Sequence, residues 1–116
     1  MREAFYAKAT RGAAPGQGGS ITDIAFSADR QQTYLYVADL LNAKIRVIRR
    51  DTLEELTSFG DGGRQPGQFY AVHSIAVDSK GNLYTTETYE GKRLQKFVYK
   101  GLRAVTRKEQ GTVWPR

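Results

Sequence analysis

Side chains of the types that most often do chemistry are sparse in this sequence. Its 116 residues include one histidine, His73, and no cysteine. The lack of cysteine excludes disulfides, thiolate metal sites and cysteine nucleophiles. One histidine among many hydroxyl residues gives no basis for assigning a Ser-His-Asp triad. Any chemistry must therefore rest on His73, on carboxylates, or on exposed aromatic and basic side chains.

Asp39 and Glu87 are two carboxylates whose placement suggests general acid and general base work, which a pair of acids can share. Asp39 ends the run Leu35-Tyr36-Val37-Ala38-Asp39, and Glu87 ends the similar run Leu83-Tyr84-Thr85-Thr86-Glu87. Their identical place in two similar segments favours a structural role, in which each accepts hydrogen bonds from the backbone of the following turn. We favour this second interpretation.

These runs belong to a longer internal repeat. Ile24-Ala25-Phe26-Ser27 recurs as Ile75-Ala76-Val77-Asp78, 51 residues later, and Lys44-Ile45-Arg46-Val47-Ile48 recurs as Arg93-Leu94-Gln95-Lys96-Phe97, 49 residues later. Self-similarity at roughly 20 to 50 residues is typical of propellers and solenoids. The sequence therefore predicts two copies of one structural unit.

Each repeated run is short, apolar or alternating, and bounded by turn residues, which is typical of strands. We expect an all-β fold of two four-stranded antiparallel meanders. The first unit, 20–60, has expected strands at Thr22–Phe26, Tyr34–Ala38, Lys44–Arg49 and Glu54–Phe59. The second, 70–107, has them at Ser74–Val77, Leu83–Thr88, Arg93–Tyr99 and Ala104–Arg107. Residues 3–10 are expected to form the outer strand of a preceding unit, and residues 108–116 a tail.

A glycine-rich link, Gly60 to Phe69, joins the two units. Its glycines let the chain cross from the outermost strand of one unit to the innermost strand of the next. Phe69 is a lone aromatic at the end of this crossing, and it is expected to anchor the crossing between the units.

The repeat resembles NHL repeats. The similarity lies in Ile75-Ala76-Val77-Asp78, Gly81-Asn82-Leu83-Tyr84, an acidic residue, and Arg93-Leu94-Gln95-Lys96-Phe97, and in the crossing from Ser58-Phe59-Gly60 to Pro66-Gly67-Gln68-Phe69. It covers residues 20–101, about two blades. NHL proteins are commonly six-bladed β-propellers, and two blades alone leave apolar faces in water. The resemblance implies either a fragment of a larger propeller or self-assembly into a ring, in which three copies supply six blades.

A weaker similarity concerns His73. The stretch from Gly67-Gln68-Phe69 to His73-Ser74-Ile75-Ala76 resembles a zinc-ligand region of peptidyl-hydroxyglycine amidating lyases, which are NHL-type propellers. The resemblance implies that His73, whose counterpart in the first unit is Thr22, faces a central channel as a ligand for zinc. We favour instead a channel-facing or hydrogen-bonded histidine and expect no cofactor, with zinc or calcium at His73 as the alternative. A catalytic zinc site needs three protein ligands, and one chain offers one histidine. The catalytic tyrosine and arginine of those lyases are absent from the matching stretches, 39–42 and 87–90.

The first functional hypothesis is a noncatalytic propeller module, or propeller fragment, that presents loops for protein or small-ligand binding. Tyr70, Tyr89 and Arg93 are its candidate binding residues, with a wedge between blades as the alternative for Tyr70. The second hypothesis is a part of a metal-dependent propeller lyase or hydrolase that uses His73. The third is binding of single-stranded RNA through a basic face.

The charge distribution motivates the third hypothesis. The net charge is +6, and residues 92–116 hold eight basic residues and one acidic residue beside Phe97, Tyr99 and Trp114. Such a segment can track phosphates while bases stack on rings. We favour a solvated basic face instead, because charge runs usually serve solubility. No apolar run is long enough for a membrane span, and no signal-peptide core follows Met1, so we expect a soluble protein whose compartment the sequence leaves open.

Overall fold

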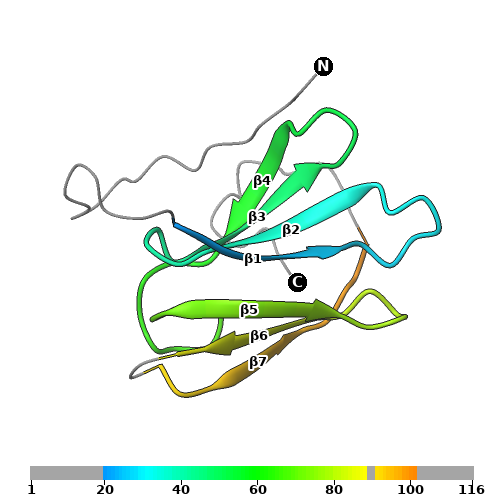
Figure 1. The fold of residues 1–116 in the computed structure, drawn as a ribbon. Coiled ribbons are helices and arrows are strands. Elements are labelled where there is room, and N and C mark those ends of the chain that lie inside the picture. Colours follow the sequence, from blue (N-terminus) through cyan, green and yellow to red (C-terminus); the bar gives the residue numbers. More distant parts are fainter. Residues whose placement is uncertain (1–19, 89–90, 102–116) are drawn as a thin grey trace, which may run out of the picture.

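The computed structural model describes residues 20–88 and 91–101 (Figure 1). Within these ranges the fold is all-β and contains no helix. One antiparallel sheet has the order β1-β2-β3-β4, and a second has the order β5-β6-β7. The strands are β1 (Ile21–Phe26), β2 (Tyr34–Asp39), β3 (Lys44–Arg49), β4 (Glu55–Phe59), β5 (Val72–Val77), β6 (Leu83–Glu87) and β7 (Leu94–Phe97).

All seven strands lie where the repeat predicts them, with bounds that differ by a few residues at most. The predicted strand at 3–10, the predicted fourth strand of the second unit at 104–107 and the tail at 108–116 lie outside the described residues. No helix in the described part of the chain is long and apolar enough to cross a membrane.

The two sheets repeat each other in register. Leu35 pairs with Ile48 in the first sheet, and their repeat counterparts Leu83 and Phe97 pair in the second. Both innermost strands also carry an irregularity near their start, between Ile21 and Asp23 and between Val72 and Ser74. Thr22 and His73 therefore occupy the same bulged position, as the sequence alignment of the units predicts.

The sheets stack with the first strands of the two sheets, β1 and β5, side by side, and β4 and β7 are the last strands of their sheets (Figure 1). Two hydrogen bonds join the innermost strands. The Ile75 N–H donates to Asp23 Oδ2 at 2.9 Å, and the Thr22 hydroxyl donates to the Val72 carbonyl at 3.4 Å. This arrangement resembles adjacent propeller blades, whose first strands gather near a common axis.

The stacking is head to tail, because repeat-equivalent residues of the two sheets face opposite ways relative to the interface. The second sheet contributes Ile75, Leu83 and Phe97 to the buried core. The first sheet contributes the alternate set of positions, which is Tyr36, Ala38, Ile45 and Val47. The counterpart of Ile75 in the first sheet, Ile24, therefore lies on the side away from the second sheet, and 49% of its surface is exposed against 7% for Ile75.

Phe69 anchors the crossing, as predicted. Its side chain is completely buried and touches rings from both sheets, with centroid distances of 6.3 Å to Phe59 of β4 and 5.8 Å to Phe97 of β7. Tilted pairs at such distances add to the gain from burial. The crossing also bonds to itself, since the Phe69 N–H donates to the Asp61 carbonyl at 2.7 Å and the Gly63 N–H donates to the Phe69 carbonyl at 3.1 Å.

Gly60 is the residue that lets Phe69 reach this position. Its φ is +102°, and a Cβ there would lie 2.4 Å from the Phe69 ring. We predict that Gly60→Ala lowers the free energy of unfolding by about 2 kcal/mol or more, because it adds both a clash and a backbone strain. Gly62→Ala is the matched control, since a Cβ at Gly62 meets nothing within 4 Å. Equal urea midpoints for the two variants would contradict this account of Gly60.

Thr85 offers a second test of the interface between the sheets, in which a substitution is expected to raise stability. It is fully buried on β6, and its hydroxyl has no hydrogen-bond partner, whereas its repeat counterpart on β2 is Val37. An unpaired buried hydroxyl costs roughly 1 kcal/mol or more. We predict that Thr85→Val raises the free energy of unfolding by about 1 kcal/mol, while the exposed neighbour change Thr86→Val stays within about 0.5 kcal/mol of the parent. A Thr85→Val variant less stable than the parent in urea unfolding would contradict the prediction.

Candidate functional site

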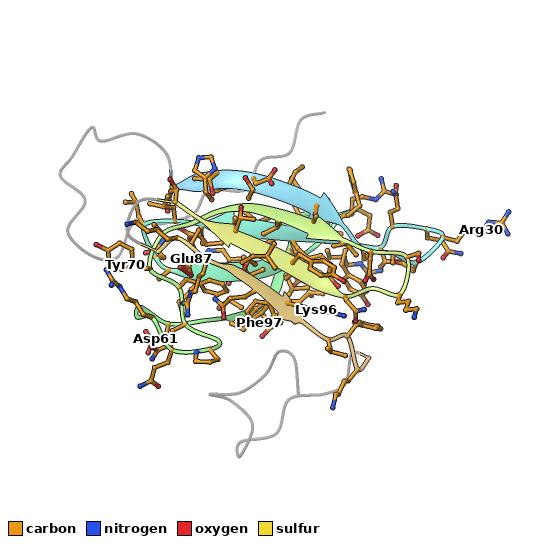
Figure 2. All side chains as sticks on the ribbon, turned by 90° about the horizontal axis from the view of Figure 1, so that it is seen from below. Arg30, Asp61, Tyr70, Glu87, Lys96 and Phe97 are labelled. Atoms are coloured by element: carbon orange, nitrogen blue, oxygen red, sulfur yellow. The ribbon has the colours of Figure 1, made fainter. Side chains whose placement is uncertain are left out.

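The connections that the sequence singled out gather at one end of the two sheets, which we call the loop end. It holds the β2–β3 turn (residues 40–43), the crossing (residues 60–71) and the starts of β1 and β5 (Figure 1). Asp61, Tyr70 and Glu87 lie at this end in Figure 2, whereas Arg30 lies at the other. Two buried acids and one cavity organise it.

Asp39 closes β2 as a fully buried carboxylate. It accepts hydrogen bonds from the Asn42 N–H at 3.3 Å and the Asn42 amide at 2.8 Å, from the Ser20 hydroxyl, and from Arg46 Nε at 2.7 Å. The bond from the Asn42 backbone confirms the predicted role in capping the following turn. Arg46 also bonds Glu55 at 3.0 Å, so this cation lies between two acids.

The environment lowers the pKa of Asp39. Burial alone would raise it, but the hydrogen bonds from Ser20, Asn42 and Arg46 and the charge of Arg46 outweigh that effect and hold the pKa below its usual 3.8. The carboxylate is therefore ionised at neutral pH and acts as a structural hub, and it has no free proton with which to act as a general acid.

Glu87 occupies the repeat position of Asp39 but has different partners. Its carboxylate accepts from Arg93 Nε at 3.1 Å and Arg93 Nη2 at 3.1 Å, and from the Tyr70 N–H at 3.3 Å. Among the described residues, no bond from the turn that follows Glu87 reaches its carboxylate. Glu87 therefore ties the second sheet to the end of the crossing.

Arg93 also binds the crossing directly. Its guanidinium donates to the carbonyls of Gly63 at 3.3 Å and Gln65 at 3.2 Å, and also to those of Arg64 and Gln68. Gln95 adds a bond to the Gln68 carbonyl at 2.8 Å and accepts one from the Gly67 N–H at 2.9 Å. The structure thus places Arg93, one of the three predicted binding residues, in bonds that hold the crossing, and a ligand would have to compete with them.

Tyr70 lies at the surface of the loop end, with 45% of its area exposed. The Arg64 guanidinium lies 4.8 Å from the centroid of its ring. It does not wedge between the sheets, since its neighbour Phe69 fills that place. The alternative interpretation of Tyr70 as a wedge is therefore wrong, and its exposure is compatible with the predicted binding role, which stays a prediction. Tyr89 lies outside the described residues.

A cavity of about 350 Å³ opens at the loop end beside Tyr70. One wall is the β2–β3 turn with Lys44, and the other is the crossing from Asp61 to Gly63 together with Phe69 and Tyr70. Its volume lies at the small end of the range for ligand sites, about 300 to 1,000 Å³. Of the two predicted binding residues that the structure describes, Tyr70 lines this cavity and Arg93 does not. The sequence does not indicate Lys44 or Asp61 as binding residues, because no sequence pattern shows that the β2–β3 turn and the crossing lie next to each other.

His73 is exposed at the bulge of β5, and its Nδ1 lies 3.3 Å from the Ser74 hydroxyl. Within the described residues, no group of three or more His, Asp or Glu side chains could hold a metal ion. A role for His73 as a ligand for zinc or calcium therefore stays a prediction, and it requires ligands from beyond the described part of one chain.

No protein-family model matches the chain, and no curated protein matches it.

The structural role of the ionised Asp39 carboxylate can be tested by substitution and by pH. A carboxylate whose pKa is lowered on folding stabilises the fold at pH values above its usual 3.8, and this stabilisation is lost as the pH falls through the folded-state pKa. We predict that Asp39→Asn lowers the free energy of unfolding by about 2 kcal/mol near neutral pH, and that the difference from the parent shrinks at about pH 2.

Asp51→Asn is the control for this test. Asp51 forms an exposed ion pair with Arg49 at 2.8 Å, so its loss should cost under about 1 kcal/mol at either pH. Urea unfolding of the three proteins at both pH values is the measurement. A difference between Asp39→Asn and the parent that stays constant with pH would contradict the assignment of Asp39 as an ionised hub.

Proposed function

We propose that this chain is a noncatalytic NHL-type propeller module whose blades are completed by further blades and whose loop end binds a protein or a small ligand. The completing blades belong either to second copies of the chain, as in a ring of three, or to a larger propeller. Head-to-tail stacking of the two sheets is the observation that carries the proposal.

In the stack, the first sheet covers one face of the second sheet, and residues of that face are buried. Ile75 and Val77 of β5 pack into the core that the first sheet covers. Their counterparts on β1, Ile24 and Phe26, are 49% and 45% exposed. We call the side of the first sheet that bears Ile24 and Phe26 its open face. Ile24 and Phe26 repeat positions that are covered in the second sheet, whereas Val37 and Ile48, which share this side on β2 and β3, are already buried.

A head-to-tail contact leaves one used and one unused face at each end of the stack, so it propagates until a ring closes. A sandwich of two sheets would satisfy both inner faces at once and leave no such demand. The internal similarity in sequence and register further supports blades of one propeller family over an independent two-sheet domain. The cavity beside Tyr70 supports ligand binding at the loop end.

The test is the solution mass of the purified chain by light scattering. We expect self-association of the parent through the open face, and we expect Ile24→Asp to shift the population to the monomer. Leu41→Asp is the matched control, because Leu41 is also exposed (38%) but lies in the β2–β3 turn, away from the open face. A monodisperse monomer for the parent, or equal effects of the two changes, would overturn completion by blades.

A further inference from the structure

The cavity at the loop end has walls of opposite charge. Lys44 lies at the start of β3 on one wall, and Asp61 lies at the start of the crossing on the other. Among the described residues, no ion pair within 4.0 Å joins these two side chains. Two unlike charges therefore line one cavity without neutralising each other.

The hydrogen bonds of Lys44 leave its ammonium largely available. Its one bond in the described part of the chain is to the Gly60 carbonyl, at the long distance of 3.5 Å. Its repeat counterpart Arg93 is, by contrast, engaged with Glu87 and with carbonyls of the crossing. Because an ammonium has three donors, Lys44 has capacity left for a carboxylate.

Asp61 is available in the same sense. Its Oδ1 accepts the N–H of the next residue, Gly62, at 2.8 Å. This local bond orients the carboxylate and leaves Oδ2 with no bond inside the described residues. A carboxylate oxygen held in this way is an acceptor for the N–H groups of a bound ammonium.

Apolar side chains share the rest of the cavity lining with Asn42, Gly62 and Gly63. Leu40 and Leu41 of the turn line one side, and the buried ring of Phe69 and the half-exposed ring of Tyr70 line the other. Such surface favours an apolar ligand group over water. Arg64 is held over the outer part of this wall by its contact with the Tyr70 ring.

We propose that this cavity binds a free amino acid with an apolar side chain, such as leucine. Its carboxylate is held by Lys44, its ammonium by Asp61, and its side chain by Leu41 and Tyr70. A molecule with both charges is favoured because it pairs with Lys44 and Asp61 at once, whereas a ligand with one charge pairs with only one of them. The inference rests on the proposed function in one respect, that the loop end is a binding face.

The experiment is a titration of the full chain with L-leucine, followed by NMR chemical-shift changes and calorimetry. We expect saturable binding, and binding at least tenfold weaker for isocaproate, which lacks the ammonium, and for isoamylamine, which lacks the carboxylate. Asp61→Asn and Lys44→Met should each weaken leucine binding tenfold or more. Asp51→Asn and Lys80→Met, at exposed positions away from the cavity, should leave it unchanged.

Asp61→Asn also guards against a trivial loss of fold, because Asp61 is exposed and Asn keeps an oxygen for the Gly62 N–H. Absence of saturable leucine binding would overturn the inference, as would equal binding of the single-charge analogues or of the Asp61→Asn protein. The proposed function has its own readout in the solution mass of the Ile24→Asp variant. A chain that assembles through the open face but does not bind leucine would overturn this inference alone.

Discussion

Burial of Phe69 between the two sheets is the interaction on which the rest of the molecule depends. The sheets share no continuous strand ladder, so their relative position rests on side-chain packing and on the short segment that joins them. Phe69 lies against Phe59 and Phe97, and these two rings are themselves 5.3 Å apart. One side chain from the crossing thus seals the outer part of an interface whose inner part is held by Asp23 and Ile75. The close approach of Gly60 to the ring makes this packing intolerant of any side chain at that glycine.

The loop end illustrates how one repeat position solves the same problem in two ways. Asp39 and Glu87 both end the second strand of a unit, and both bind an arginine that lies in the third strand or directly before it. In the first unit this arginine is Arg46, and in the second it is Arg93, which is the counterpart of Lys44. The difference between Lys44 and its counterpart Arg93 has a physical consequence. Arg93 has enough donors in a planar fork to hold several carbonyls of the crossing, whereas Lys44 at the same place keeps its charge beside an open cavity.

The sequence predicts most of the strands because each of them is bounded by turn chemistry and because three of the four strands of a unit recur as similar runs. It also predicts the role of Phe69, since an aromatic residue that follows nine positions of glycine, proline and polar residues has few ways to avoid water. It does not predict the cavity. Lys44 and Asp61 are 17 positions apart in the chain, and they meet only because the β2–β3 turn and the crossing project from the same end of the sheets. It also does not predict the bonds of Arg93, because these go to carbonyl groups, which every residue possesses.

The outward side of the first sheet and the outward side of the second sheet differ in polarity. On the first sheet, the side that covers the second sheet presents Tyr36, Ala38 and Val47. Their counterparts on the outward side of the second sheet are Tyr84, Thr86 and Lys96, and the Lys96 ammonium lies 5.7 Å from the Tyr84 ring. Burying this side would remove water from the Lys96 ammonium. Within the described residues this ammonium contacts the Tyr84 ring, which offsets the loss of hydration less well than a carboxylate does. The open face presents Ile24 and Phe26 along β1, and the charge nearest to them across the sheet, Arg46, is paired with Asp39 and Glu55. In a head-to-tail contact between copies, the open face of the first sheet therefore supplies the larger apolar area, and the outward side of the second sheet contributes polar groups.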